Sequence, residues 1–314
     1  MKKAALLFIA TVFSVFHLAA QEETPDTVKV GVYFNSVYDL NLGEKSFTAD
    51  FWIWYNYTND SINPLGSVEV SNAKEAEFSL EDVEKVGAVN WATHKCTAVL
   101  KKDWDLRQFP FDKQVLEVHI EDAIDDISTL VYVPDSANSR YDDEIKLDGW
   151  VIKGFHLRGG QRTYKTTYGN PELQGESVYP AVVARFELER DGMGLFFKLF
   201  MGVYVAYLIS LSVFFMGPEN PERFGMIVGA LFAGVANKYI VDSIMPQTIM
   251  LTLPDKIHNV TFAYIILHLI ITVWAFRLSV KEKMREGWML DRISFVVSLI
   301  SFIAINWVLI RQAL

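Results

Sequence analysis

One apolar segment, Glu222 to Pro246, holds the polar residues best placed to do chemistry in this chain. An acid, Glu222, begins it, and Asn237, Lys238 and Asp242 follow in its second half. At about 1.5 Å rise per residue, its 25 residues span roughly 37 Å as a helix, enough to cross a hydrocarbon core of about 30 Å. Lipid disfavours such polar groups, so we expect this helix to line something, with protein or water around it.

One face of this helix collects small and polar side chains. Residues on an α-helix advance by about 100° each, so positions three and four apart share a face. The stripe that starts at the acid contains Glu222, Gly225, Gly229, Phe232, Ala236, Tyr239 and Ser243. Gly225 and Gly229 also form a Gly-x-x-x-Gly pattern, so the alternative is a close helix–helix contact. Lys238 and Asp242 lie off the stripe, four residues apart, and we expect them to pair with each other.

Three further apolar segments accompany this one, and all four have membrane-spanning length. They cover about 194–216, 223–245, 257–280 and 290–311. Arg223 follows the first, and the connection between the third and fourth is basic, with Arg277, Lys281, Lys283, Arg285 and Arg292. The positive-inside rule places these two connections in the cytoplasm, so the connection 247–256 and the C-terminus lie outside.

The first 190 residues have a different pattern. Residues 1–20 have the charged start, apolar core and small-residue end of a bacterial secretory signal peptide. In residues 21–190, short alternating runs such as SFTADFWIWYNYT are separated by turns, which predicts an antiparallel, immunoglobulin-like all-β sandwich. The only helical signal is at Ser79–Val86, where Ser79 and Asp82 resemble a helix start. We therefore predict an extracellular sandwich, then an all-α transmembrane domain of four helices at 191–314, in the bacterial inner membrane with the sandwich in the periplasm or outside.

Composition excludes several functions. The net charge of −9 argues against nucleic acid and suits a surface that gathers cations. The single cysteine, Cys96, excludes an intramolecular disulfide or a cysteine metal cluster, and its alternating context favours a buried structural thiol. The chain has no nucleophile elbow, phosphate-binding loop or dinucleotide fingerprint, so we expect neither an enzyme nor a catalytic cofactor.

The stretch DWDLRQFPFDKQVLEVHIED, residues 103–122, resembles the signature loop of the pentameric ligand-gated ion channels, the Cys-loop receptor superfamily. The matching positions are Trp104, Leu106, Phe109, Pro110 and Asp112. The family's two bridging cysteines would fall at Lys102 and Leu116, and both are absent, as in the prokaryotic branch. SFTADFWIWY and LDGWVIKGF resemble strands of the bacterial channels. The second apolar segment begins with Pro-Glu-Arg and ends with proline, as their cation-channel pore helix does.

This resemblance implies a subunit of a homopentameric ligand-gated channel, with four identical subunits, membrane lipid and permeant cations as partners. It places the stripe on the channel axis, where five copies of Glu222 would ring the cytoplasmic mouth and favour cations. Phe232 would close the pore at mid-membrane and Tyr239 would constrict it above. The family often has hydroxyl side chains where Gly225 and Gly229 stand. Those glycines favour the alternative, a non-conducting membrane receptor or scaffold of the same fold.

The resemblance also implies where a stimulus reaches the membrane. The loop Phe109-Pro110-Phe111-Asp112 and the turn Leu40–Lys45 would rest on the connection 247–254. Arg190 would pair there with Asp112 or with Glu44. The alternative is an ordinary turn with exposed charges.

In this family agonists bind between subunits under a capping loop, here Tyr164–Tyr179. The aromatic residues that would hold an amine by cation–π contact are Trp52, Trp54, Tyr141, Tyr168 and Tyr179. The alternative is ordinary core or interface packing. The usual Trp-x-Pro motif before Cys96 is absent, so the agonist, whether a small molecule or a proton, is left open.

Two further groups have chemical alternatives. Glu121, Asp122, Asp125 and Asp126 are dense enough to hold a modulating Ca²⁺, or they form a solvated acidic face. His268, inside the third apolar segment, either titrates to modulate opening or is a hydrogen-bonded packing residue.

Overall fold

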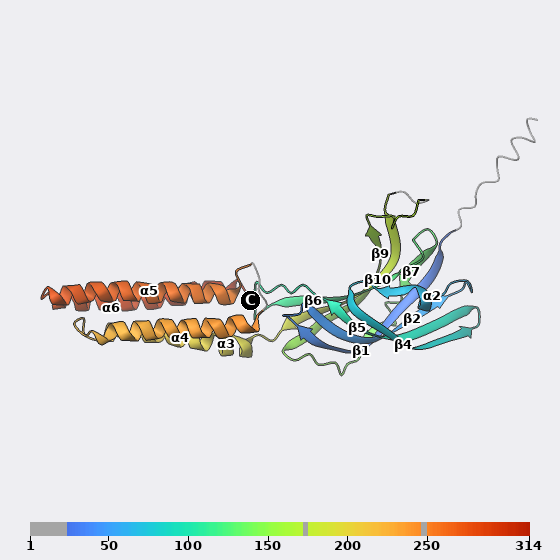
Figure 1. The fold of residues 1–314 in the computed structure, drawn as a ribbon. Coiled ribbons are helices and arrows are strands. Elements are labelled where there is room, and N and C mark those ends of the chain that lie inside the picture. The colour runs from blue at the N-terminus through green and yellow to red at the C-terminus, as the bar shows by residue number, and fades with distance from the viewer. Residues whose placement is uncertain (1–23, 172–174, 246–249) are drawn as a thin grey trace, which may run out of the picture.

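The computed structural model of the protein describes residues 24–171, 175–245 and 250–314. It has a β-sandwich followed by four long helices that run side by side away from it (Figure 1). This is the fold class that the sequence predicts. The expected signal peptide, residues 1–20, lies outside the described residues.

The larger sheet of the sandwich has six strands. They are β1 (Asp26–Asn41), β2 (Ser46–Tyr57), β4 (Ala73–Val86), β5 (Val89–Lys101), β7 (Leu130–Pro134) and β8 (Arg140–Tyr141). Their order is β4-β5-β2-β1-β7, with β8 beside β1. β1 pairs in parallel with both β7 and β8, so the sheet is mixed and not purely antiparallel as predicted.

The smaller sheet has four strands in the order β3-β6-β10-β9. These are β3 (Val68–Val70), β6 (Lys113–Asp122), β9 (Trp150–Tyr164) and β10 (Ser177–Arg190), and the short helix α2 (Pro64–Ser67) leads into β3. Alternate residues of both sheets fill the space between them; Val32 and Phe34 of β1, Leu116 of β6 and Phe186 of β10 are all buried there. This alternation is the period-2 pattern of a half-buried strand.

The expected helix start at Ser79–Val86 is wrong, because this segment is the second half of β4. Ser79 lies opposite Lys95 and Asp82 opposite Thr93, with a bulge between the two pairs where Leu80 has a φ of 54°. A Ser-x-x-Asp pattern offers only local capping hydrogen bonds, whereas β5 offers a ladder along the whole strand. The bulge accommodates the residues that do not fit that ladder.

The helical domain contains α3 (Met193–Ser212), which continues into the 3₁₀ turn η1 (Val213–Phe215), then α4 (Glu222–Ile244), α5 (Leu253–Val280) and α6 (Met284–Arg311). All four are long and apolar enough to cross a membrane, which identifies a multi-pass membrane protein. α5 begins at Leu253, earlier than predicted, because Thr252 and Asp255 form a reciprocal capping box. α6 likewise begins at Met284, earlier than the expected 290.

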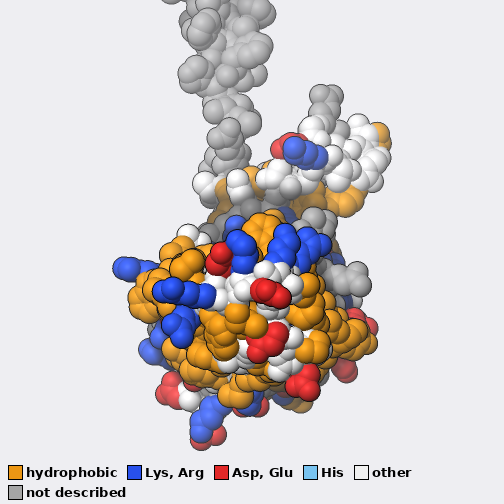
Figure 2. Space-filling view, turned by 90° about the vertical axis from the view of Figure 1, so that its left-hand side faces the viewer, with side chains coloured by type: hydrophobic (Ala, Val, Ile, Leu, Met, Phe, Trp, Pro, Cys, Tyr) orange, Lys and Arg blue, Asp and Glu red, His pale blue; other side chains and the backbone are white. Residues whose placement is uncertain are grey.

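The two connections between η1 and α4 and between α5 and α6 lie at the end of the helices away from the sandwich, here called the distal end (Figure 1). Figure 2 views the molecule from that end and shows Lys and Arg side chains over it, with acidic ones among them. Lys281, Lys283, Arg285 and Arg292 are exposed there. The C-terminus returns to the sandwich, where Ala313 is buried beside Leu106 and Phe109.

Candidate functional site

The predicted stripe on α4 faces away from the rest of the chain. All seven of its residues are exposed, and the exposed fractions of Phe232 and Tyr239 reach 69% and 76%. A Cβ placed on Gly225 or Gly229 would meet nothing within 4 Å, whereas one on Gly234, on the opposite face, would come within 2.9 Å of Phe262. The stripe is therefore the face of α4 that this chain leaves uncovered.

At the distal end of α4, two neighbouring charges have opposite surroundings. Glu222 is exposed, and its backbone N–H donates to the Asn220 side chain over 2.9 Å. Arg223 turns inward, and its Nη2 donates to Oδ1 of Asp291 on α6 over 2.7 Å, with both side chains fully buried. Sequence reasoning used Arg223 only as a topology signal and missed its partner. An acid beside the apolar run of α6 was the available signal, because a buried charge needs a counter-charge.

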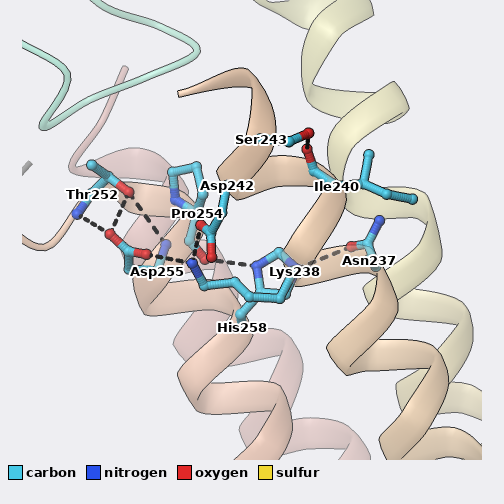
Figure 3. A network of polar contacts seen from close by, with 9 residues as sticks. All are labelled: Asn237, Lys238, Ile240, Asp242, Ser243, Thr252, Pro254, Asp255 and His258. Carbon is cyan, nitrogen blue, oxygen red and sulfur yellow. Dashed lines mark hydrogen bonds and ion pairs between the residues drawn. The ribbon is translucent and has the colours of Figure 1, made fainter. Parts of the chain in front are cut away.

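A polar network ties the other end of α4 to the start of α5 (Figure 3). Lys238 pairs with Asp242, as predicted, and also donates to Asp255 of α5 over 2.9 Å. Asp255 in turn accepts from the backbone N–H and the hydroxyl of Thr252, over 2.8 and 2.7 Å. One lysine thus joins the two helices through the carboxylate that caps α5.

His258 extends this network across the helices (Figure 3). Its Nδ1 lies 2.8 Å from the carbonyl oxygen of Pro254, and its Nε2 lies 3.0 Å from the side-chain oxygen of Asn237 on α4. Asn237 also packs against Gly202 of α3, where a Cβ would come within 2.8 Å of its amide nitrogen. Three helices therefore meet at one buried polar centre near the sandwich.

The junction between the domains is held by Arg190, the last residue of β10. Its Nε donates to Oδ1 of Asp112 over 2.6 Å, and its Nη2 to Oδ2 over 3.3 Å. The guanidinium also lies 3.9 Å from the ring centroid of Trp150 and 4.9 Å from that of Phe109. Of the two partners expected for Arg190, the structure has Asp112. Glu44 is exposed and belongs to a turn in which its carbonyl oxygen accepts from Lys74.

The Phe-Pro loop, Phe109 to Asp112, packs apolar side chains against the end of the helical domain that is nearest the sandwich. Phe109, whose bond to Pro110 is cis, is buried with Phe200 of α3 and Ile257 of α5, and Phe111 lies 5.6 Å from Phe196. Gly192 permits this close approach, because a Cβ there would overlap the Pro110 carbonyl. The sequence predicts that this loop contacts residues 247–254. The first three residues of that segment, 247–249, lie outside the described residues.

Three tyrosines gather at the β9–β10 hairpin. Tyr164, Tyr168 and Tyr179 have ring centroids 5.9 to 6.5 Å apart. They line a cleft of about 820 Å³ that also contains Glu69 and Glu121. Tyr168 and Tyr179 were predicted ligand residues, whereas Tyr164 was used only to bound the capping loop. The three come together because β9 and β10 pair in a register that sets Tyr164 opposite Ser177.

The acid of this cleft, Glu121, has unusual surroundings. It is only 1% exposed, and it accepts a hydrogen bond from the Tyr164 hydroxyl. Its Oε2 has no hydrogen-bond partner in the part of the chain that the structure describes, although Nε of Arg162 lies 4.0 Å away. Burial, with the neighbouring Glu69, raises the pKa of Glu121. Burial and Glu121 together raise the pKa of Tyr164 to about 12. An acid among aromatic rings fits a cation or a titrating proton.

The other predicted ligand residues lie elsewhere in the chain. Trp52 and Trp54 line a separate, mainly apolar cleft of about 870 Å³ on the larger sheet, where the Trp54 indole donates to Asp135 over 3.2 Å. Tyr141 packs against the sandwich core, with ring centroids 5.8 Å from Phe155 and 5.6 Å from Phe186. The pairing of β8 with β1 sets Tyr141 opposite the buried Phe34, and its role as a ligand residue stays a prediction.

The expected calcium site is not assembled. The Asp122 carboxylate accepts from the hydroxyls of Ser67 and Tyr132 and from the backbone N–H groups of Ile124 and Asp125. Glu121 is turned into the tyrosine cleft, and Asp126 caps its own turn through Ser128. Within residues 24–171, 175–245 and 250–314, no group of three or more His, Cys, Asp or Glu side chains is placed to hold a metal ion. The local turn geometry uses the oxygens that Ca²⁺ would need.

Two histidines, His268 and His94, and the cysteine Cys96 are buried and packed among neighbouring side chains. His268 lies between helices, with Nδ1 3.0 Å from the Ser210 hydroxyl and Nε2 2.6 Å from the Ser298 hydroxyl. His94 is buried in the sandwich beside Tyr55, and burial lowers its pKa to about 4. Burial raises the pKa of Cys96 to about 12, which leaves the thiol unreactive.

Comparison with known proteins adds one relative. No protein-family model matches the chain. A protein named as a proton-gated ion channel, from Gloeobacter violaceus (strain ATCC 29082 / PCC 7421), is 20% identical to it over 308 residues. The match covers 91% of this chain and 83% of the relative, so it includes both the sandwich and the helices.

Proposed function

We propose that this chain is a subunit of a homopentameric ligand-gated ion channel of the bacterial inner membrane, selective for cations, with α4 lining the pore. The similarity to a proton-gated channel along 91% of the chain supports the general class. The observation that carries the proposal is the uncovered stripe on α4, from Glu222 to Ser243.

Lipid is a poor environment for that stripe. It contains an ionisable acid, two glycines and a serine, while the flanking positions Val228, Val235 and Ile240 are exposed and apolar. A helix with a polar stripe between apolar flanks suits a ring of identical helices, in which the flanks touch neighbours and the stripe faces water. Five Glu222 carboxylates at one mouth would attract cations, and Phe232 and Tyr239 would narrow the path.

We place the stimulus site in the tyrosine cleft. β10 runs from Ser177, in the cleft, to Arg190 at the junction, and only two residues separate Arg190 from the start of α3. A cation or a proton that changes the charge balance at Glu121 would act on this strand, and Arg190 would pass the movement to the Phe-Pro loop. The relative's name, a proton-gated channel, fits an acid whose pKa burial raises.

Charge reversal at Glu222 tests the pore. We expect purified protein in planar bilayers to carry current in asymmetric KCl, with a reversal potential near that of K⁺. Glu222→Lys should move the reversal potential toward that of Cl⁻, and cross-linking should trap pentamers of both proteins. Current with an unchanged reversal potential would contradict the role of Glu222. Trapped pentamers that never conduct under pH, amine or divalent screens would favour the non-conducting receptor instead.

The coupling role of Arg190 has its own test. Removing one partner of a buried ion pair costs about 3–5 kcal/mol, so we expect Arg190→Ala and Asp112→Ala each to impair opening strongly. The double variant should be little worse than either single one, because both remove the same interaction. Strictly additive effects on the opening equilibrium would show that the two residues act independently.

A further inference from the structure

We propose that Asp291, on α6 and away from the pore stripe, determines cation selectivity by neutralising Arg223. This inference rests on the proposed function, because it assigns a role at the mouth of the same pore. Asp291 acts through Arg223 and never touches the permeating ion.

Two adjacent residues of opposite charge lie at the distal end of α4. Glu222, the acid proposed to select cations, is followed directly by Arg223, a positively charged side chain. In a ring of five subunits, five arginines would stand at the same level as five glutamates. Left uncompensated, they would cancel most of the field that attracts cations.

The geometry removes that cancellation. Arg223 points into its own subunit, and its Nη2 donates to Oδ1 of Asp291 over 2.7 Å. Neither side chain is exposed, and in the described residues no other hydrogen bond reaches Nε or Nη1 of Arg223 or Oδ2 of Asp291. Asp291 is therefore the group that balances Arg223, and Glu222 keeps its full charge at the mouth.

Other charges near this level contribute less to the electric field at the pore mouth. Lys281, Lys283, Arg285 and Arg292 at the distal end are all exposed. Lys283 additionally pairs with Glu286 over 3.0 Å. Water and salt screen such exposed charges, with a Debye length of about 8 Å at physiological ionic strength. Arg223 lies in a low-dielectric interior, where an unbalanced charge acts over a longer range.

Loss of Asp291 leaves two outcomes for Arg223, and both weaken cation preference. The guanidinium either stays buried and adds a positive charge behind each Glu222, or it turns outward and pairs with Glu222 itself. The sequence anticipates neither outcome, because Arg223 and Asp291 lie 68 positions apart and meet only in the folded helices.

The test measures the K⁺ to Cl⁻ permeability ratio from reversal potentials in asymmetric KCl. Asp291→Asn should lower the ratio about tenfold or more, since it leaves one uncompensated charge per subunit. Asp291→Glu, which keeps the carboxylate, should retain cation preference. The double variant Arg223→Gln/Asp291→Asn, which has neither charge, should recover the wild-type ratio to within about twofold.

Recovery in the double variant separates charge balance from simple structural damage. A ratio as low in the double variant as in Asp291→Asn would overturn the proposal. If five Asp291→Asn subunits fail to assemble, mixed pentamers with one variant subunit should show a smaller fall in the ratio, and an unchanged ratio there would overturn it too. Glu222→Gln separates failure of this inference from failure of the proposed pore. If Glu222→Gln lowers the selectivity and Asp291→Asn does not, only the role of Asp291 is wrong. If neither variant lowers the selectivity, the proposed pore is wrong.

Discussion

α4 and α6 bury the same share of their apolar span, 22%, yet the chemistry of their two faces is reversed. α6 turns polar residues inward, among them Asp291, Ser298 and Asn306, and leaves large apolar side chains outside. Apart from Arg223 at its start, α4 turns apolar and small residues inward, such as Ile227 and Val241, and it leaves Glu222, Gly225, Gly229 and Ser243 outside.

The exposed side chains of these two helices therefore suit two different environments. The outer face of α6, with Val297, Ile300 and Trp307 at 60%, 63% and 66% exposed, suits lipid. Its inner polar residues are satisfied by partners on other helices, as the pairing of Ser298 with His268 illustrates. In the proposed channel, the outer face of α4 borders water, and neighbouring subunits exclude lipid from it.

The largest effect should come from placing the same charge on each face. We expect Val297→Lys to impair membrane integration by about 2.5–3.5 kcal/mol, because the charge enters lipid near the helix centre. Ala236→Lys should integrate normally, because its side chain enters water, but it should suppress cation current. The fraction of protein integrated into membranes measures the first effect, and bilayer recording the second. Equal integration defects would break the contrast between the faces.

The inner face of α6 should be sensitive to the loss of a single hydroxyl. Ser298→Ala removes the partner that lies 2.6 Å from Nε2 of His268 and 3.4 Å from the Tyr207 hydroxyl. A buried polar atom left without a partner costs about 1–3 kcal/mol, and we expect a fall of that size in the free energy of unfolding in detergent. Ser212→Ala is the matched control, since that hydroxyl donates to the carbonyl oxygen of Ile209 in its own helix. If both variants unfold at the same denaturant concentration, the inner network adds no stability.

Two glycines on opposite faces of α4 give a smaller, sharper test. Gly229→Ala should raise the free energy of unfolding by up to about 1 kcal/mol, because alanine favours helix and its Cβ meets nothing in the chain. Gly234→Ala should lower it, because the new methyl group would come within 2.9 Å of Phe262. Denaturation in detergent measures both, and single-channel recording of Gly229→Ala should show reduced conductance. A fall in the free energy of unfolding for Gly229→Ala would mean that Gly229 is covered.

A further prediction concerns the stimulus that opens the proposed pore. The proposed binding of a cation in the tyrosine cleft would require ionised Glu121, whose pKa is raised above its ordinary value by burial and by Glu69. The affinity for tetramethylammonium, used as a probe, should therefore fall as the pH falls through that raised pKa, at a higher pH than for an ordinary glutamate. Glu121→Gln should bind a few-fold more weakly, with no such pH dependence. Glu176→Gln, at an exposed position of the same cleft, should keep it. Unchanged pH dependence in Glu121→Gln would exclude this acid as the titrating group.

Hydrophobic periodicity predicted most of the sandwich strands, the four helices and the exposed stripe of α4, because each depends on which side chains share a face. It failed at the second half of β4, where the pattern suggested a helix start. The Arg190–Asp112 pair was anticipated through the family resemblance. Contacts between elements distant in sequence were missed, including Arg223 with Asp291 and Lys238 with Asp255. The place of Tyr164 in the cleft was missed for the same reason, because strand register, which local patterns do not specify, decides which tyrosines reach it.

The proposed contrast is that the outer face of α4 borders water in a conducting pore while that of α6 borders lipid. Its most direct test introduces one cysteine on each face, Ala236→Cys and Ile300→Cys, in a chain whose only native thiol, Cys96, is buried. A membrane-impermeant cationic thiol reagent is then applied during bilayer recording of open channels. We expect it to block the current of Ala236→Cys and to leave that of Ile300→Cys unchanged. Unblocked current in Ala236→Cys, or equal block in both variants, would contradict the assignment of α4 to the pore.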